Sequence, residues 1–289
     1  MSSVLNMQRA VRTVRRRQQG ISYHRAPSFH DPISQACTFD QIESPEFRTW
    51  CARLHTPRWC HRKLWEWCFI LQALTVNDMA APGRRGLGFA VGNEPISAWL
   101  AACGATLVAT DLPDAREKAA EWKATGQHAA RLADLVHDDI CPADQFLERV
   151  SFRPVDMNDI PADLRDFDFA WSACAIEHLG DLEAGLRFFE RQLDCLAPGG
   201  VGVHTTEFNV SSDDATLADG HTVLYRRRDI EELVTRVQAL GHDMRVTFAL
   251  GETPEDLHVD LPPYTNTHLR MKTADFVNTS FGLIVRKAR

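Results

Sequence analysis

Short apolar runs alternate with longer amphipathic segments along residues 81–289. The runs are too short for helices and fit strands that are buried on both faces of a sheet. They are centred on residues 85–88, 105–109, 151–155, 167–172 and 201–205. Between them, apolar residues recur at a spacing of three and four, as a helix with one buried face requires. Strands that alternate with helices predict an α/β fold with a mostly parallel sheet.

Residues 1–80 have a different pattern. The first thirty residues contain no Asp or Glu and include a basic run from Arg9 to Arg17. We expect residues 1–40 to form a basic, solvated tail. The alternative is a homo-oligomer contact through this region, because apolar residues at 4, 7, 11 and 14 fall on one side of a helix. Helical spacing after Ser44 and again over residues 58–74 predicts a helical region at residues 41–80.

Composition narrows the class of protein. A chain of 289 residues with 44% hydrophobic content can bury a full α/β core. No apolar run approaches the roughly 20 residues that span a bilayer, so no membrane partner is expected. The net charge of −7 argues against nucleic-acid binding driven by overall charge. Eight scattered cysteines without a secretory signal indicate reduced thiols, and we expect a cytoplasmic protein.

A glycine-rich turn follows the first strand of this pattern. Gly86, Gly88 and Gly92 remove side chains where the strand turns into a helix, so a ligand can approach the backbone. The next strand ends at Asp111, about 20 residues on, where a carboxylate can accept hydrogen bonds from a ribose diol. The turn therefore predicts a nucleotide-type cofactor.

Two cofactors use this geometry. Read from Gly88, the turn is Gly-Phe-Ala-Val-Gly, which resembles the G-x-G-x-G turn of class I S-adenosylmethionine (SAM)-dependent methyltransferases with Ala90 at the middle glycine. Read from Gly86, it is G-x-G-x-x-x-G, which keeps an NAD(P)-dependent oxidoreductase open as an alternative.

Later motifs strengthen the resemblance to the methyltransferases over roughly residues 80–289. The strand Phe-Asp-Phe-Ala-Trp-Ser ends at Ser172 and is followed by Glu177-His178, and a Leu-x-Pro-Gly-Gly turn precedes the fifth strand. The resemblance implies a Rossmann-like fold with a central, mostly parallel seven-stranded sheet, a C-terminal antiparallel hairpin from residues 243–250 and 279–287, and an N-terminal helical extension. It also implies that helices at 41–80 form a lid, for which Trp65, Glu66 and Trp67 are candidates.

The same resemblance implies where the cofactor binds. Asp156, at the end of the third strand, would accept from the adenine amino group, and Met157 would lie on the ring. The expected cofactor-binding residues are Gly88, Ala90, Gly92, Asp111, Leu112, Asp156, Met157 and Ser172.

The sequence says less about the residues that would bind and activate the molecule that accepts the methyl group. Candidate bases are His178, His204 and Glu207, because histidine titrates near neutral pH and loops after parallel strands hold ligands. No metal site is predicted, although Glu207 and the acids at 213, 214 and 260 with His258 leave a divalent cation open. We expect an O-methyltransferase for a small polar acceptor, such as a sugar or natural-product hydroxyl, with S-adenosylhomocysteine (SAH) as product. The resemblance extends to a bacterial branch associated with polysaccharide or natural-product pathways. A non-catalytic SAM-binding protein is the other alternative.

Overall fold

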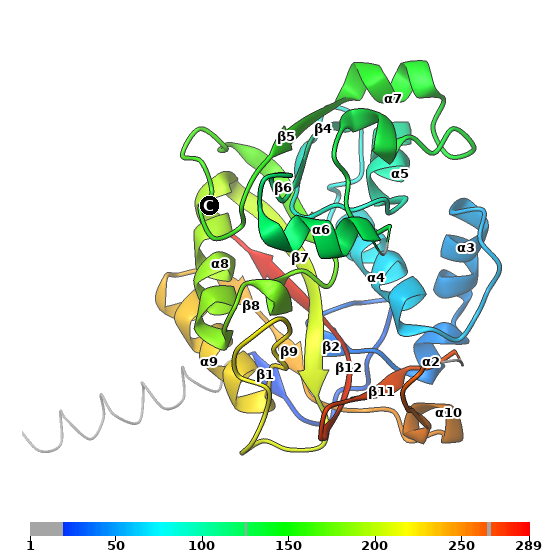
Figure 1. The fold of residues 1–289 in the computed structure, drawn as a ribbon, viewed down its shortest axis with the longest axis vertical. Helices are drawn as coiled ribbons and strands as arrows, with labels where there is room; N and C mark the ends of the chain where they lie inside the picture. Colours follow the sequence, from blue (N-terminus) through cyan, green and yellow to red (C-terminus); the bar gives the residue numbers. More distant parts are fainter. Residues whose placement is uncertain (1–19, 125, 265–266) are drawn as a thin grey trace, which may run out of the picture.

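A twisted sheet with helices packed on both faces forms the body of the protein (Figure 1). The structure is a computed structural model and describes residues 20–124, 126–264 and 267–289. The basic run from Arg9 to Arg17 lies outside the described residues. In the described ranges, no helix is long and apolar enough to cross a bilayer.

Five parallel strands make the centre of the sheet, in the order β5-β4-β3-β6-β7. They are β3 (Arg85–Gly88), β4 (Thr106–Asp111), β5 (Val150–Pro154), β6 (Phe167–Ser172) and β7 (Leu196–Asn209). The chain returns from β5 to the other side of β3, so the strand order reverses between β3 and β6. Ligands bind at such a switch point in open α/β sheets.

Antiparallel strands extend the sheet beyond β7. β12 (Phe276–Arg286) pairs antiparallel with β7, and β8 (Asp243–Met244) pairs antiparallel with β12. Together with the five parallel strands they give the seven expected, so the Rossmann-like fold class is confirmed. The described sheet has ten strands, because β2 (Gln35–Ala36), β10 (Val259–Asp260) and β11 (Arg270–Thr273) add three short ones.

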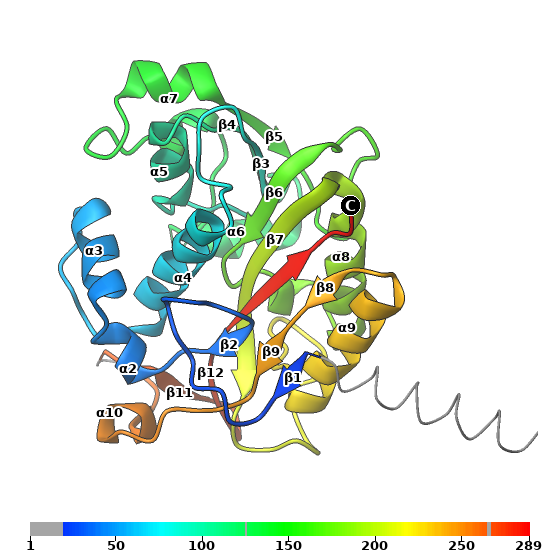
Figure 2. The same ribbon diagram turned by 180° about the vertical axis from the view of Figure 1, so that it is seen from behind.

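Residues 20–40 are part of the fold and not a solvated tail, which corrects that expectation. β1 (Ile21–Ser22) pairs with β9 (Val246–Thr247), and β2 pairs with β12 (Figure 2). The expected strand at 243–250 is thus divided into β8 and β9, which belong to different sheets. Strands of two residues are too short to give a recognisable apolar pattern.

In the described part of the chain, three helices precede the first parallel strand: α2 (Phe39–Ile42), α3 (Pro45–Arg53) and α4 (Arg62–Val76). Ser44 Oγ accepts from the Phe47 amide at 3.1 Å and begins α3. α4 packs against β7 and β12 so closely that a Cβ on Gly282 would lie 2.1 Å from the Phe69 ring. Trp65 and Glu66 on α4 are fully buried, so most of this helix is core and only its first turns reach the cavity described below.

The remaining helices connect the strands and cover the two faces. They are α5 (Ile96–Ala102), α6 (Glu117–Ala124), α7 (Ala143–Arg149), α8 (Leu182–Cys195), α9 (Arg227–Ala239) and α10 (Pro254–Leu257), with 3-10 turns η1 (Leu132–Leu135) and η2 (Ile176–His178). α4 and α5 pack on one face, and α8 and α9 on the other (Figure 1). Residues 128–137 contain the short 3-10 turn η1, and His128 and Ala129 hydrogen-bond to the end of β4.

Candidate active site

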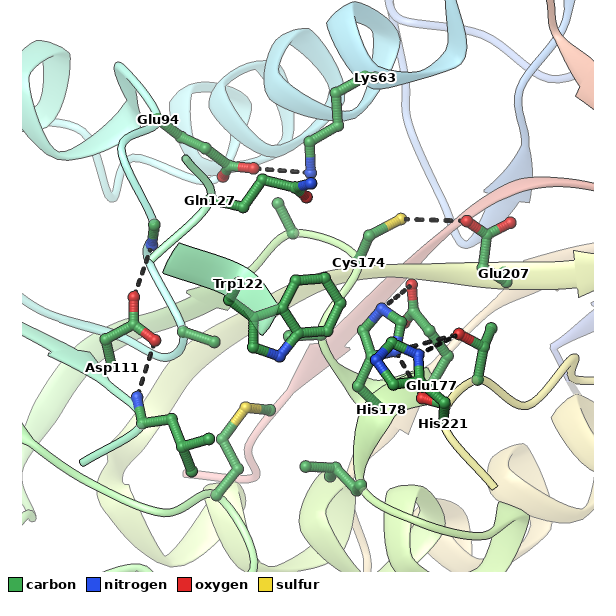
Figure 3. A pocket seen from close by; sticks show the side chains of 18 of the residues that line it. Lys63, Glu94, Asp111, Trp122, Gln127, Cys174, Glu177, His178, Glu207 and His221 are labelled. Atoms are coloured by element: carbon green, nitrogen blue, oxygen red, sulfur yellow. Dashed lines mark hydrogen bonds and ion pairs between the residues drawn. The ribbon is translucent and has the colours of Figure 1, made fainter. Parts of the chain in front are cut away.

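A cavity of about 950 Å³ opens at the carboxyl ends of the parallel strands (Figure 3). Its lining includes Ala90 after β3, Asp111 on β4, Asp156 after β5, Cys174 after β6 and Glu207 on β7. It therefore spans the point where the strand order reverses. One half lies against the glycine turn, and the other half lies against buried carboxylates.

The glycine turn forms one wall of the cavity. Ala90 and Gly92 line it with φ angles of +46° and +52°, and a Cβ on Gly92 would lie 2.7 Å from the Gln127 carbonyl oxygen. The contact with Gln127 excludes a side chain at position 92, and the positive φ adds strain for residues other than glycine. Gly88 is not among the lining residues, which corrects its expected role. Its missing side chain makes room for Trp171, whose ring would lie 2.4 Å from an added Cβ.

Asp111 holds the turn in place. Its Oδ2 accepts from the amides of Gly92 at 3.1 Å and Ala129 at 3.0 Å, and its Oδ1 accepts from the Leu112 amide at 2.7 Å. Burial raises the pKa of this carboxyl, and the backbone donors oppose that rise. Asp111 and Leu112 line the cavity as expected. Each carboxylate oxygen has two lone pairs, so Oδ1 keeps one for a hydroxyl donor.

Asp156 and Met157 line the same half of the cavity. Asp156 Oδ1 accepts from the Asn158 amide at 2.9 Å, and its other oxygen lies 3.1 Å from the Arg116 guanidinium. Trp122 on α6 also lines the cavity, with its ring 4.5 Å from that of His178 (Figure 3). Trp122 was not among the expected site residues, because a single aromatic residue in a short helix has no signature.

His204 and Ser172 do not line the cavity, which corrects both assignments. Both are fully buried, and Ser172 Oγ lies 2.8 Å from His204 Nδ1. The His204 ring packs edge-on against Phe188 and Phe189 of α8, and burial lowers its pKa to about 3. Side chains alternate along a strand, so residues 204 and 207 of β7 point to opposite faces.

His178 lines the cavity but is a poor base. Its Nδ1 lies 2.8 Å from the His221 carbonyl oxygen, which can only accept, so Nδ1 donates. Burial lowers the pKa of His178 to about 4, and the ring is therefore neutral at pH 7. A group of such low pKa has little driving force for removing a proton from an alcohol.

Carboxylates gather in the other half of the cavity around Cys174. Cys174 Sγ donates to Glu66 Oε1 at 3.0 Å and lies 4.0 Å from Glu207 Oε1. Glu177 Oε2 accepts from Thr206 Oγ1 at 3.0 Å. Glu207 was an expected site residue, whereas Cys174 was not and Glu177 had no expected role. The Glu-His pair after the fourth strand was the available signal for Glu177.

Two basic residues of α4 offset part of the negative charge of these carboxylates. The Arg62 guanidinium lies 2.6 Å from Glu207 Oε1 and 3.4 Å from Glu66 Oε1. Lys63 Nζ lies 2.7 Å from Glu94 and 3.3 Å from Glu66. Burial raises the pKa of Glu66, but Lys63 and Arg62 outweigh it, so its pKa lies below the ordinary value. Burial raises the pKa of Glu207 to about 7, against the opposing effect of Arg62.

The expected acids for a divalent cation do not come together. Asp213 bonds to Arg227 at 2.8 Å, and Asp260 lies 3.0 Å from His268. Within the described ranges, the one group of three metal-type side chains close enough for a single ion is Cys174, Glu177 and Glu207. Arg62 already pairs with Glu207 there, which disfavours a cation at the same oxygen.

No protein-family model matches the chain, and no curated protein matches it. In solved structures, 781 chains match. Magnesium protoporphyrin IX methyltransferase from Synechocystis, with bound SAH, is 10% identical over 86% of this chain and 97% of its own, at a TM-score of 0.45. A SAM-dependent methyltransferase from Mesorhizobium loti is 14% identical over 74% and 96%, at 0.42. The N-terminal domain of EvdMO1 with SAH is 14% identical over 76% and 81%, at 0.45. At these low identities and TM-scores, the matches are a likeness in fold alone and say nothing of the reaction.

Proposed function

We propose that the chain is a SAM-dependent methyltransferase that methylates a hydroxyl of a small polar acceptor, such as a sugar or a natural product. The observation that carries the proposal is the single cavity that joins the glycine turn and strand-end acids to a buried carboxylate cluster. The motifs around Gly88, Asp156 and Glu177, which resemble those of class I methyltransferases, support it.

The residues present fit the cofactor. Ala90 and Gly92 leave the backbone open where a Cβ at 92 would collide, and Asp111 keeps a lone pair for a ribose hydroxyl. Asp156 and Met157 would hold the adenine. Lys63 and Glu94, paired at 2.7 Å beside the turn, offer opposite charges to the amino-acid end of SAM. SAM would supply a methyl group on a positively charged sulfur that leaves readily.

The chain must then align the acceptor and remove its proton. Trp122, His178 and the first turns of α4 wall the cavity and limit water. The carboxylate cluster lies beyond the glycine turn, and the cavity therefore has room beside the cofactor half for an acceptor. This arrangement favours an enzyme over a non-catalytic SAM-binding protein.

A methyl-transfer screen tests the proposal. Purified protein would be incubated with methyl-labelled SAM and a panel of sugars, catechols, hydroxy acids and amines, with each reaction followed by product label and SAH formation. We expect a hydroxyl acceptor to take the label. Label on amines only would overturn the O-methylation, and SAM binding without transfer to any acceptor would favour the non-catalytic alternative.

A further inference from the structure

Acids outnumber bases in the half of the cavity beyond the glycine turn. Glu66, Glu177 and Glu207 are buried there and Glu94 is partly buried, whereas the bases are the partly buried Arg62 and Lys63. Glu66 lies beneath the cavity and the other five line it. Burying an ionised carboxylate without a partner is costly, so the cluster favours a further positive charge.

Glu177 is the carboxylate that lacks a cation. Its Oε2 accepts from Thr206, while its Oε1 is fully buried and has no hydrogen-bond donor in the described part of the chain. Its ion-pair partner there is His178 Nε2, at 3.9 Å, whose ring is neutral at pH 7. Glu177 nevertheless lines the cavity (Figure 3).

The titratable groups facing Glu177 add no positive charge. They are Glu66 from α4, Cys174 from the loop after β6, Glu207 from β7, Tyr225 before α9 and its neighbour His178. Acids and neutral groups thus surround a buried, unpaired oxygen of a residue that lines the cavity.

We propose that Glu177 is the counter-charge of the ligand: it faces the sulfonium of SAM before transfer and accepts the acceptor's proton at Oε1 during it. This inference rests on the proposed function. The step conserves charge and atoms. The acceptor O–H bond breaks and its proton goes to Glu177, the new C–O bond forms, and the C–S bond breaks with its electron pair left on sulfur.

The pKa of Glu177 suits both roles. Burial raises it to about 7, with Glu66 adding to the rise, so the group is part ionised at neutral pH. A base titrating near the working pH is efficient. A sulfonium nearby favours the ionised form, whereas the neutral thioether of SAH does not. Ionised Glu177 should therefore hold SAM more tightly than SAH and favour release of the product.

Calorimetry with SAM and SAH tests this inference on the whole chain. The wild type, Glu177→Gln and the matched surface variant Glu183→Gln would be titrated at about pH 6 and about pH 8.5. Glu183 lies on α8, partly exposed and paired with Arg236 at 2.8 Å, away from the cavity. The protonation equilibria of free SAM and free SAH are the same in all three experiments, so they cancel when the proteins are compared.

In the wild type and Glu183→Gln, we expect the preference for SAM over SAH to grow by up to about tenfold between the two pH values, as one group with a pKa near 7 ionises. In Glu177→Gln this growth should disappear. The same growth in all three proteins would overturn the inference. If neither ligand binds any of them, the proposed function itself fails.

Proton release gives a second readout that needs no variant. Titration of the wild type at pH 7 in two buffers of different ionisation enthalpy reports the protons exchanged on binding. SAM should displace more protons than SAH, because only the sulfonium favours ionised Glu177. Equal proton release by the two ligands would contradict the inference, whether or not Glu177→Gln folds.

Discussion

The Asp111 side chain has a structural role within the chain in addition to its predicted role in ligand binding. Its position at the end of the second strand predicted a ribose contact. In the structure, the Asp111 carboxylate already accepts hydrogen bonds from three backbone amides, those of Gly92, Leu112 and Ala129. The sequence could not reveal these bonds, because Ala129 lies 18 residues after Asp111, in the connection between α6 and η1.

Asp111→Ala is predicted to destabilise the protein as well as weaken SAM binding. Two buried N–H groups and one partly buried N–H group would lose their acceptor, and we expect the free energy of unfolding to fall by about 2 to 4 kcal/mol. Urea unfolding measures this change. Asp111→Asn is the matched control, since one carbonyl oxygen can keep part of the bonding. An unchanged midpoint for the alanine variant would show that these bonds are not important for stability.

Glu177 should also affect the stability of the ligand-free protein. Its folded pKa of about 7 lies above the ordinary 4.5, so between these values the folded state keeps a proton that the unfolded state releases. Stability contributed by this group is therefore lost as pH rises from about 5 to about 8. We predict that Glu177→Gln melts at a higher temperature than the wild type at pH 8, and that the difference shrinks at pH 5.

Thermal unfolding of both proteins across this pH range is the measurement. His61, whose pKa burial lowers to about 4, shapes the pH profile of both proteins alike and cancels in the difference. A difference independent of pH would mean that the Glu177 carboxyl titrates at its ordinary value.

At the scale of elements, the glycine turn was predictable because backbone geometry leaves a sequence signature. Gly92 has φ of +52° and faces the Gln127 carbonyl at the distance given above. Short strands left no such signature. β2 and β9 have two residues each, and their pairing depends on β12 and β1, which lie far away in the sequence.

Gly92→Ala is predicted to damage the turn. The added Cβ meets backbone atoms in a left-handed conformation, so we expect a loss of roughly 1 to 3 kcal/mol in stability and a marked loss of SAM affinity. Gly83→Ala is the matched control, because Gly83 also has positive φ, +80°, but an added Cβ there meets nothing within 4 Å. Equal losses in the two variants, by chemical unfolding and calorimetry, would mean that the close approach to Gln127 is unimportant.

For the whole molecule, the parallel sheet followed from the apolar runs, and its antiparallel addition was implied by the resemblance to the methyltransferases. The site was predicted only in part. Residues next to strand ends, such as Asp156 and Glu207, line the cavity. His204 does not line the cavity. Its position before the strand end did not show which face of the sheet its side chain would take. Arg62 and Lys63 come from α4, and only the packing of α4 on the sheet brings them there.

Self-association through the N-terminal region stays a prediction at this scale. Residues 1–19 lie outside the described part of the chain, and they combine five arginines with apolar residues at helical spacing. If they mediate contact between copies, the full chain should sediment as a dimer or larger species and a chain lacking residues 1–19 as a monomer. Identical sedimentation of the two chains would contradict the prediction.

The central claim is that the cavity is built for SAM, and one calorimetric titration tests it most directly. The full-length protein would be titrated with SAM and, separately, with NAD under the same conditions. The glycine turn, Asp111 and Asp156 predict SAM binding with a Kd on the order of micromolar and no heat from NAD. Binding of NAD without binding of SAM would contradict the claim and favour an oxidoreductase.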